Sequence, residues 1–200
     1  MKDIKSCEKS FRDIWIAMQV ILSGDKSRTV VISSATKGEG VTTTIINLGK
    51  AIALEKKVLL LEANFENPIF SNIFNLPQEN GLTDILSGKL EIEKAIKRKD
   101  ENRNLFIITA GSNISDHHSL ALPEWEDLLY KLKEIFDIIL IDTPSVTSNP
   151  DVASLASICD GIILVIQADK TRREVVEHAK RTINNAKAKL LGSILNRRVY

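Results

Sequence analysis

The sequence has few cysteines and no long apolar run. Cys7 and Cys159 lie far apart and match neither a CxxC motif nor a metal-ligand spacing. We therefore expect two small buried apolar groups in a reducing compartment rather than a disulfide. No apolar stretch approaches the roughly 18 residues that a transmembrane helix needs. The opening residues 1–5 are not followed by the apolar region of a signal peptide. We expect a cytoplasmic protein without a membrane span of its own.

The sequence also lacks an excess of charge of either sign. Its 200 residues include 27 Lys and Arg against 26 Asp and Glu, which leaves a net charge of +1. No overall field draws such a chain to nucleic acid or to an acidic membrane, so we expect no nucleic-acid partner, and any polyanion site must be local. Hydrophobic residues at 44% and charged residues at 26% are usual for a globular protein. This composition excludes disordered, collagen-like and disulfide-scaffold proteins.

Short apolar runs rich in Ile, Leu and Val recur along the chain. They cover residues 29–33, 58–63, 105–109, 138–142, 162–166 and 190–195, and helical patterns cover 43–55, 120–133, 151–158 and 172–186. Nearly continuous apolar runs are typical of parallel strands covered on both faces. The alternation predicts an α/β fold with a doubly wound, mostly parallel sheet flanked by helices. The polar stretch 97–104 is expected to be a solvated loop.

An apolar stripe precedes the first predicted strand. Ile4, Cys7, Phe11, Ile14, Trp15, Met18 and Leu22 are spaced mostly by three and four. This spacing predicts an amphipathic N-terminal helix. We expect residues 1–27 to pack on or lead into a single domain of residues 28–200. A face that binds a partner is the alternative.

A glycine-rich loop joins the first predicted strand to the next helix. Residues 33–44 read SSATKGEGVTTT. Glycines let backbone amides turn inward, and the N-terminus of the following helix adds its dipole, so such a loop can cradle phosphate. We predict a nucleotide site that is formed by Gly38, Glu39, Gly40, Val41, Thr42 and Thr43.

This loop departs from the phosphate-binding motif AxxxxGK[ST] at one position. Ala35, Gly40 and Thr42 match the motif, but Val41 replaces its lysine. The Thr42 hydroxyl can still bind Mg²⁺, whereas no group at position 41 can reach the β and γ phosphates. Loss of a cation that stabilises the transition state harms catalysis more than binding. Lys37 can supply a relocated ammonium group or simply face solvent.

Asp142 ends the apolar run 138–142, and Thr143 and Pro144 follow it. A carboxylate at the end of a buried strand completes many P-loop sites by positioning Mg²⁺. A turn or helix-capping aspartate is the alternative.

The same residues resemble the bacterial tyrosine kinases, the cytosolic kinase modules of polysaccharide co-polymerases. The resemblance extends over residues 34–44, 58–68, 81–88, 104–111, 137–146, 160–165 and 191–196. It implies a P-loop fold similar to the septum-positioning and partitioning ATPases, with ATP or ADP and Mg²⁺ as ligands. It also implies an adenine-binding role for Asn196, for which a simple turn residue is the alternative.

The sequence departs from this family mainly at positions to which the family assigns catalytic, assembly or phosphate-acceptor roles. Glu62 and Asn64 stand at the two aspartates of the second acidic motif, and Glu66 stands at its basic position. Asn64 cannot act as a general base because an amide has no usable pKa. The ring-forming ExxRxxR motif corresponds to Lys9, Arg12 and Trp15, so assembly of several copies stays open. The family's C-terminal tyrosine cluster is reduced to Tyr200.

These losses favour a catalytically impaired regulator or scaffold of exopolysaccharide or capsule assembly. The expected partner is a membrane-embedded polysaccharide co-polymerase or export protein, which would hold the chain at the inner face of the membrane. Candidate catalytic residues are Asp142, Glu62 and Lys37, and candidate metal ligands are Thr42, Asp142 and Glu62. One alternative is an active tyrosine autokinase or ATPase that uses Lys37. A partitioning-type ATPase ranks last, because Thr36 stands where that class has its signature lysine.

Overall fold

A computed structural model describes residues 2–24, 27–98, 103–112 and 122–196 of the chain. Its helices are α1 (Lys2–Ile21), α2 (Val41–Ile52), α3 (Phe70–Phe74), α4 (Leu82–Leu86), α5 (Ile92–Ala95), α6 (Leu122–Lys133), α7 (Asp151–Ser157) and α8 (Arg173–Asn185). Its strands are β1 (Arg28–Ser34), β2 (Val58–Glu62), β3 (Lys97–Arg98), β4 (Leu105–Ile108), β5 (Ile138–Asp142), β6 (Gly161–Gln167) and β7 (Leu190–Asn196). Tyr200 lies outside the described residues.

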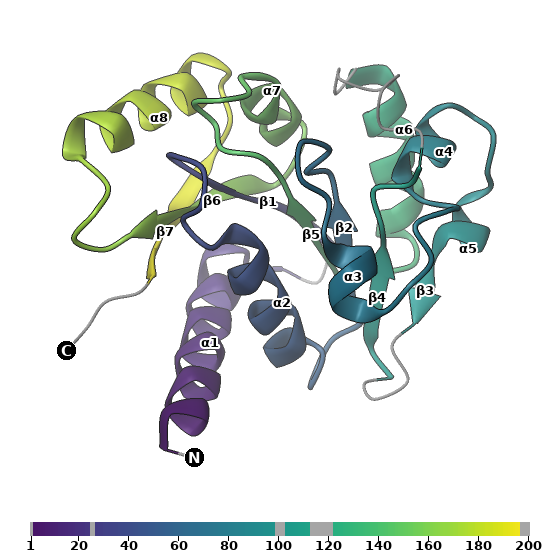
Figure 1. The fold of residues 1–200 in the computed structure, drawn as a ribbon, viewed down its shortest axis with the longest axis horizontal. Helices are drawn as coiled ribbons and strands as arrows, with labels where there is room; N and C mark the ends of the chain where they lie inside the picture. Colours follow the sequence, from purple (N-terminus) through teal and green to yellow (C-terminus); the bar gives the residue numbers. More distant parts are fainter. Residues whose placement is uncertain (1, 25–26, 99–102, 113–121, 197–200) are drawn as a thin grey trace.

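The strands form one seven-stranded sheet in the order β3-β4-β2-β5-β1-β6-β7. Every neighbouring pair is parallel except β3 and β4. Helices cover both faces of the sheet (Figure 1), with α1 and α2 on one side and α6, α7 and α8 on the other. The predicted doubly wound, mostly parallel α/β fold is therefore confirmed.

Two apolar clusters explain why the strands are apolar along their whole length. On β1, Val30 and Ile32 belong to the cluster beneath α1 and α2, whereas Val31 belongs to the cluster beneath α6 and α7. Successive side chains of a strand point to opposite faces, so a sheet buried on both faces needs apolar residues at every position.

The solvated loop predicted at 97–104 is wrong at its first two residues. Lys97 and Arg98 form β3, which pairs antiparallel with β4. The Lys97 ammonium donates to the carbonyl oxygens of Pro77 and Glu79, both at 3.0 Å. These long-range bonds hold a polar segment against the sheet edge, and its local sequence gives no sign of them.

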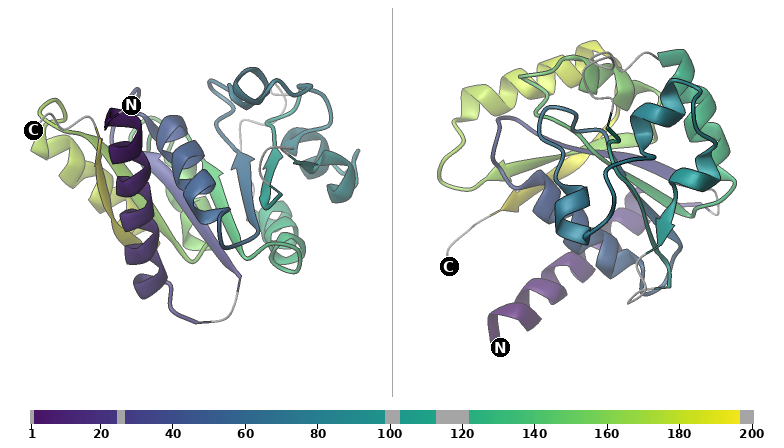
Figure 2. Two further views of the ribbon diagram at one scale, coloured as in Figure 1. Left: turned by 90° about the horizontal axis from the view of Figure 1, so that it is seen from below. Right: turned by 45° about the vertical axis from the view of Figure 1, so that its right-hand side comes forward.

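The N-terminal helix α1 packs on α2, as the apolar stripe predicts. Trp15 and Met18 are each 3% exposed, and the Trp15 indole N–H donates to Glu55 Oε2 at 3.2 Å. The expectation that Cys7 is buried is wrong, because Cys7 is exposed. The N-terminal end of α1 projects beyond the rest of the fold (Figure 2), and Cys7 lies toward that end of the helix. Within the described part of the chain, no helix has both the length and the apolar character needed to cross a membrane.

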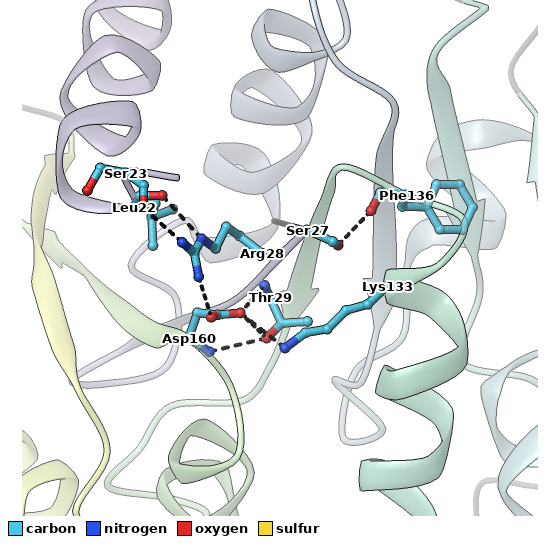
Figure 3. Close-up of polar contacts among 8 residues, drawn as sticks. All are labelled: Leu22, Ser23, Ser27, Arg28, Thr29, Lys133, Phe136 and Asp160. Atoms are coloured by element: carbon cyan, nitrogen blue, oxygen red, sulfur yellow. Dashed lines mark hydrogen bonds and ion pairs between the residues drawn. The ribbon is translucent and has the colours of Figure 1, made fainter. Parts of the chain in front are cut away.

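Asp160 joins three parts of the fold at the N-terminal end of β1 (Figure 3). Its carboxylate pairs with Arg28 at 3.2 Å and with Lys133 at 3.3 Å, and it accepts the Thr29 backbone N–H at 2.8 Å. Arg28 also donates to the Leu22 carbonyl oxygen at 3.2 Å, just after α1. This cluster ties α1, the sheet and α6 together at the end of β1 remote from the glycine-rich loop.

Candidate nucleotide site

The site lies where β1, β2 and β5 end. These three strands are neighbours in the sheet, and Glu62 and Asp142 occupy paired positions at the ends of β2 and β5. The glycine-rich loop follows Ser34 at the end of β1 and leads directly into α2. Ligands of open parallel sheets bind at this edge, so the topology brings the predicted site residues together.

The loop conformation depends on its glycines. Gly38 and Gly40 have φ values of 84° and 91°, in the left-handed region. A Cβ on Gly40 would also come within 2.2 Å of Asn196 Nδ2. Gly40 is therefore required both by its backbone angle and by the close approach of β7. Thr43 is exposed at the start of α2, on the solvent side of the loop.

Thr42 and Asp142 are in direct contact. The Thr42 hydroxyl donates to Asp142 Oδ2 at 2.9 Å, and Asp142 is 1% exposed. Burial raises the pKa of Asp142 to about 8; the bond from Thr42 opposes this rise, and the nearby Glu62 charge adds to it. Asp142 Oδ1 is buried without a hydrogen-bond partner among the described residues. A hydroxyl beside a carboxylate with an unused oxygen suits Mg²⁺, so these two residues fit the predicted metal.

Glu62 is held by the backbone on all sides. Its Oε1 accepts the N–H groups of Ile69 at 2.6 Å and Phe70 at 2.7 Å, and its Oε2 accepts the Ala110 N–H at 2.9 Å. Glu62 is 1% exposed, and burial raises its pKa despite these bonds. The carboxylate therefore fixes the start of α3 and the end of β4 to β2. Its predicted catalytic and metal-binding roles stay predictions.

Lys37, the lysine of the glycine-rich loop, forms an ion pair with Glu66. Lys37 Nζ pairs with Glu66 Oε2 at 2.5 Å, and the Lys37 side chain is 69% exposed. Val41, at the position of the usual lysine, is 9% exposed and packs in the apolar cluster beneath α1 and α2. Asn64 Oδ1 accepts the Asn67 N–H at 3.3 Å within the turn after β2. Lys37 and Glu66 each stand out in the sequence, but their pairing was not predicted, although their opposite charges were a signal for it.

Glu39 braces the loop against the strand β6. Its buried carboxylate accepts the Thr36 N–H at 2.9 Å and the Gln167 N–H at 3.3 Å, and it also accepts a hydrogen bond from the Thr171 hydroxyl. Asn196 Nδ2 donates to the Glu39 carbonyl oxygen at 2.8 Å. Gln167 and Thr171 were not predicted as loop contacts, because no local pattern marks residues that meet the loop only after folding. Asn196 thus contacts the loop, and its predicted adenine binding stays a prediction.

A parallel sheet with a glycine-rich loop, a helix-initiating threonine and a buried aspartate on the neighbouring strand defines a P-loop NTPase fold. Comparison with known proteins narrows this class. An AAA domain family profile matches residues 27–196. Tyrosine-protein kinase YwqD of Bacillus subtilis is 34% identical over 171 residues, which cover 84% of this chain and 72% of YwqD. The chain belongs to the bacterial tyrosine kinase family of P-loop proteins.

Two further relatives extend the comparison. The crystal structure of the VpsO kinase domain is 30% identical and superimposes with a TM-score of 0.83, with all of both chains covered. The succinoglycan biosynthesis transport protein ExoP of Rhizobium meliloti is 28% identical over 94% of this chain but only 25% of ExoP. In ExoP, the matching module is therefore one part of a much larger transport protein.

Proposed function

We propose that this chain is a catalytically impaired bacterial tyrosine kinase that acts as a regulator or scaffold in exopolysaccharide or capsule assembly. Its P-loop retains a site for ATP or ADP with Mg²⁺, held by the loop backbone, Thr42 and Asp142. Mg²⁺ bound there would neutralise phosphate charge. The family's transfer of phosphate to tyrosine is impaired.

One observation carries this proposal: a buried valine, Val41, occupies the position of the motif's lysine. Val41 packs into the apolar core, and Lys37 pairs with Glu66 at 2.5 Å. Removing one transition-state donor typically lowers the rate by roughly 10² to 10³. The backbone amides of the loop are unaffected by this loss, so binding suffers less than catalysis.

Asn64 and Glu62 support the same conclusion. Asn64 has an amide where the family has a carboxylate, and an amide cannot take the proton of a tyrosine hydroxyl. The Glu62 carboxylate accepts three backbone N–H groups, which leaves it poorly placed to serve as a replacement base. Two independent parts of the reaction, phosphate stabilisation and proton removal, are thus weakened together.

The relatives support a membrane-embedded partner. The match covers 25% of ExoP, a protein named for succinoglycan biosynthesis transport, so three quarters of its length lies outside the matching module. We infer that this chain works with a membrane-embedded polysaccharide co-polymerase or export protein, at the inner face of the membrane. The low net charge of +1 supports recruitment by a protein rather than by acidic lipid.

Calorimetry of ATP and ADP, with and without Mg²⁺, tests the nucleotide site. We expect weak binding by the natural protein and stronger Mg²⁺-dependent binding by Val41→Lys. Asp142→Asn is the matched control, in which the Mg²⁺ dependence should be lost. In a parallel assay with a tyrosine peptide, the natural protein should transfer no phosphate. Transfer that is abolished by Asp142→Asn contradicts the impairment.

An active kinase that uses Lys37 is the second candidate. Lys37 is the one lysine in residues 34–44, and an exposed ion pair holds it with less than about 1 kcal/mol. Glu66→Gln should then free Lys37 and strengthen ATP binding, while Lys37→Ala should abolish turnover. Residual turnover that is the same in Lys37→Ala and in the natural protein excludes this candidate.

A further inference from the structure

Residues of α4, α5 and α6, together with the segment that joins α4 to α5, line a groove. These three helices lie on the same side of the molecule as β4 (Figure 1). The groove encloses about 480 Å³. Its floor is apolar and is formed by Ile85, Leu86, Leu90, Ile92 and Leu128. Four of these side chains are only partly buried against the core beneath them. Apolar side chains that remain accessible in a groove are typical of a surface that binds a partner.

The rim of this groove is acidic. Among the described residues, Glu91, Glu93, Glu124 and Asp127 line it together with the cation Lys131. Asp127 pairs with Lys131 at 2.6 Å, and Glu91 pairs with Lys94 at 2.9 Å. Within the described ranges, neither Glu93 nor Glu124 forms a salt bridge, and both side chains are exposed. The Glu93 charge acts on Lys94 only from beyond ion-pair distance. The groove therefore has an apolar floor and a net negative rim.

This chemistry selects among ligands. A nucleotide, a phosphate group or an anionic lipid surface is repelled by the rim. The described residues hold no group of three or more His, Cys, Asp or Glu side chains arranged to bind a metal ion. An apolar floor between carboxylates suits a peptide with apolar side chains on one face and Lys or Arg beside them.

We propose that this groove binds a basic amphipathic segment of the membrane partner, at the cytoplasmic end of a transmembrane helix. This inference rests on the proposed function, which supplies the membrane partner. Cytoplasmic segments next to transmembrane helices carry an excess of Lys and Arg, and this charge complements Glu93 and Glu124. Apolar residues of the same segment enter between Leu90 and Leu128.

The groove wall is anchored to the candidate nucleotide site. At the start of α4, the Leu82 N–H donates to the Thr109 carbonyl oxygen at 2.8 Å and the Thr83 N–H donates to Ala110 at 2.9 Å. The Ala110 N–H in turn donates to Glu62. A segment bound in the groove therefore lies against a wall that is fixed to the C-terminal ends of β4 and β2.

Titration of the full chain with a synthetic peptide tests the groove. The probe is a 14-residue amphipathic helix of Leu and Lys, compared with a Leu and Glu peptide and a Ser and Lys peptide of the same length. We expect the Leu and Lys peptide to bind at least tenfold more tightly than either of the others. Equal binding of the Ser and Lys peptide contradicts a role for the apolar floor.

A charge-reversed variant locates the binding. Glu93→Lys with Glu124→Lys should weaken Leu and Lys peptide binding at least tenfold. Glu134→Lys with Glu174→Lys is the matched control, with the same change in net charge at exposed positions outside the groove. The control should alter binding less than twofold. Equal effects of the two double variants overturn the proposal, because they show attraction by net charge alone.

Two further outcomes separate the alternatives. If Glu93→Lys with Glu124→Lys dissociates an oligomer in sedimentation experiments, the groove holds a second copy of the chain and the proposal is overturned. The peptide titration contains no nucleotide, so it is independent of the calorimetric test. If the peptide does not bind but ATP binds as expected, only the proposal for the groove is rejected. If the peptide binds specifically but the protein is an active kinase, only the proposed catalytic impairment is rejected.

Discussion

The Thr42 hydroxyl donates to Asp142 Oδ2 at 2.9 Å and so joins the first turn of α2 to the end of β5. The aspartate is 1% exposed, and its other oxygen has no partner among the described residues. This arrangement keeps an incompletely satisfied carboxyl group at the place where Mg²⁺ is expected. Burial is the main reason that its pKa lies near 8. A bound cation would favour the charged form instead.

Mg²⁺-dependent nucleotide binding should therefore depend on pH. With a pKa of about 8 in the free protein, about one Asp142 in ten is ionised at pH 7. The metal binds the carboxylate, so binding releases this proton and strengthens roughly tenfold from pH 7 to pH 9. Calorimetry at pH 7 in buffers of different ionisation enthalpy measures the released proton. The signal should disappear in Asp142→Asn, and proton release that persists in that variant contradicts the assignment.

Asp142 should also make the stability of the free protein depend on pH. Its folded pKa is raised above its ordinary value of 3.8, so the folded state holds the proton more tightly. The contribution of Asp142 to the free energy of unfolding is therefore full below about pH 4. It decreases as the pH rises to about 8, by up to about 1.4 kcal/mol per pH unit. The difference in unfolding free energy between the natural protein and Asp142→Asn, measured by urea titration from pH 5 to 9, isolates this contribution. A difference that is independent of pH contradicts the raised pKa.

Glu62→Gln should destabilise the protein. Glutamine has one side-chain acceptor oxygen, whereas Glu62 accepts three backbone N–H groups with two. At least one buried N–H loses its partner, which costs about 1–3 kcal/mol. Urea unfolding measures the loss, with the more exposed Glu66→Gln as control, expected within about 0.5 kcal/mol. A variant of natural stability that has lost Mg²⁺-dependent binding shows instead that Glu62 is a metal ligand.

The sequence predicts the strands and the phosphate loop well because their signals are local. Apolar runs such as 138–142 match β5 at both ends, and Thr42 and Asp142, each singled out from a local motif, lie in contact. The sequence predicts poorly which residues contact each other when they are distant along the chain. Glu39 meets Gln167 across 128 positions, and nothing in the local pattern marks this contact. Cys7 was misassigned because periodicity shows which face of a helix is apolar but not how far its cover extends.

Asp160→Asn should destabilise the end of the sheet remote from the loop. Burial raises the pKa of Asp160, but the Thr29 N–H and the Lys133 charge outweigh it, so the net pKa is lowered. A lowered pKa stabilises the fold above the ordinary carboxyl pKa, and this contribution disappears as pH falls through the lowered value. We expect Asp160→Asn to lower the free energy of unfolding by about 2 kcal/mol at pH 7. Below the lowered pKa of Asp160, the variant and the natural protein should differ little. Asp127→Asn, which breaks an exposed pair with Lys131, is the control and should cost less than about 0.5 kcal/mol.

Trp15 should be the main attachment of α1 to the domain. It is 3% exposed, and its indole N–H donates to Glu55, so Trp15→Ala removes both apolar packing and a hydrogen bond. We expect a loss of about 3–5 kcal/mol, and a smaller loss for Trp15→Phe, which keeps most of the apolar contact. Ile16→Ala, at a neighbouring position that is 53% exposed, is the control and should cost less than about 0.5 kcal/mol. Hydrogen exchange distinguishes local from global effects: if α1 releases alone, its amides exchange faster in Trp15→Ala while those of β5 keep their protection. Equal acceleration in α1 and β5 shows instead that the helix and the sheet unfold as one unit.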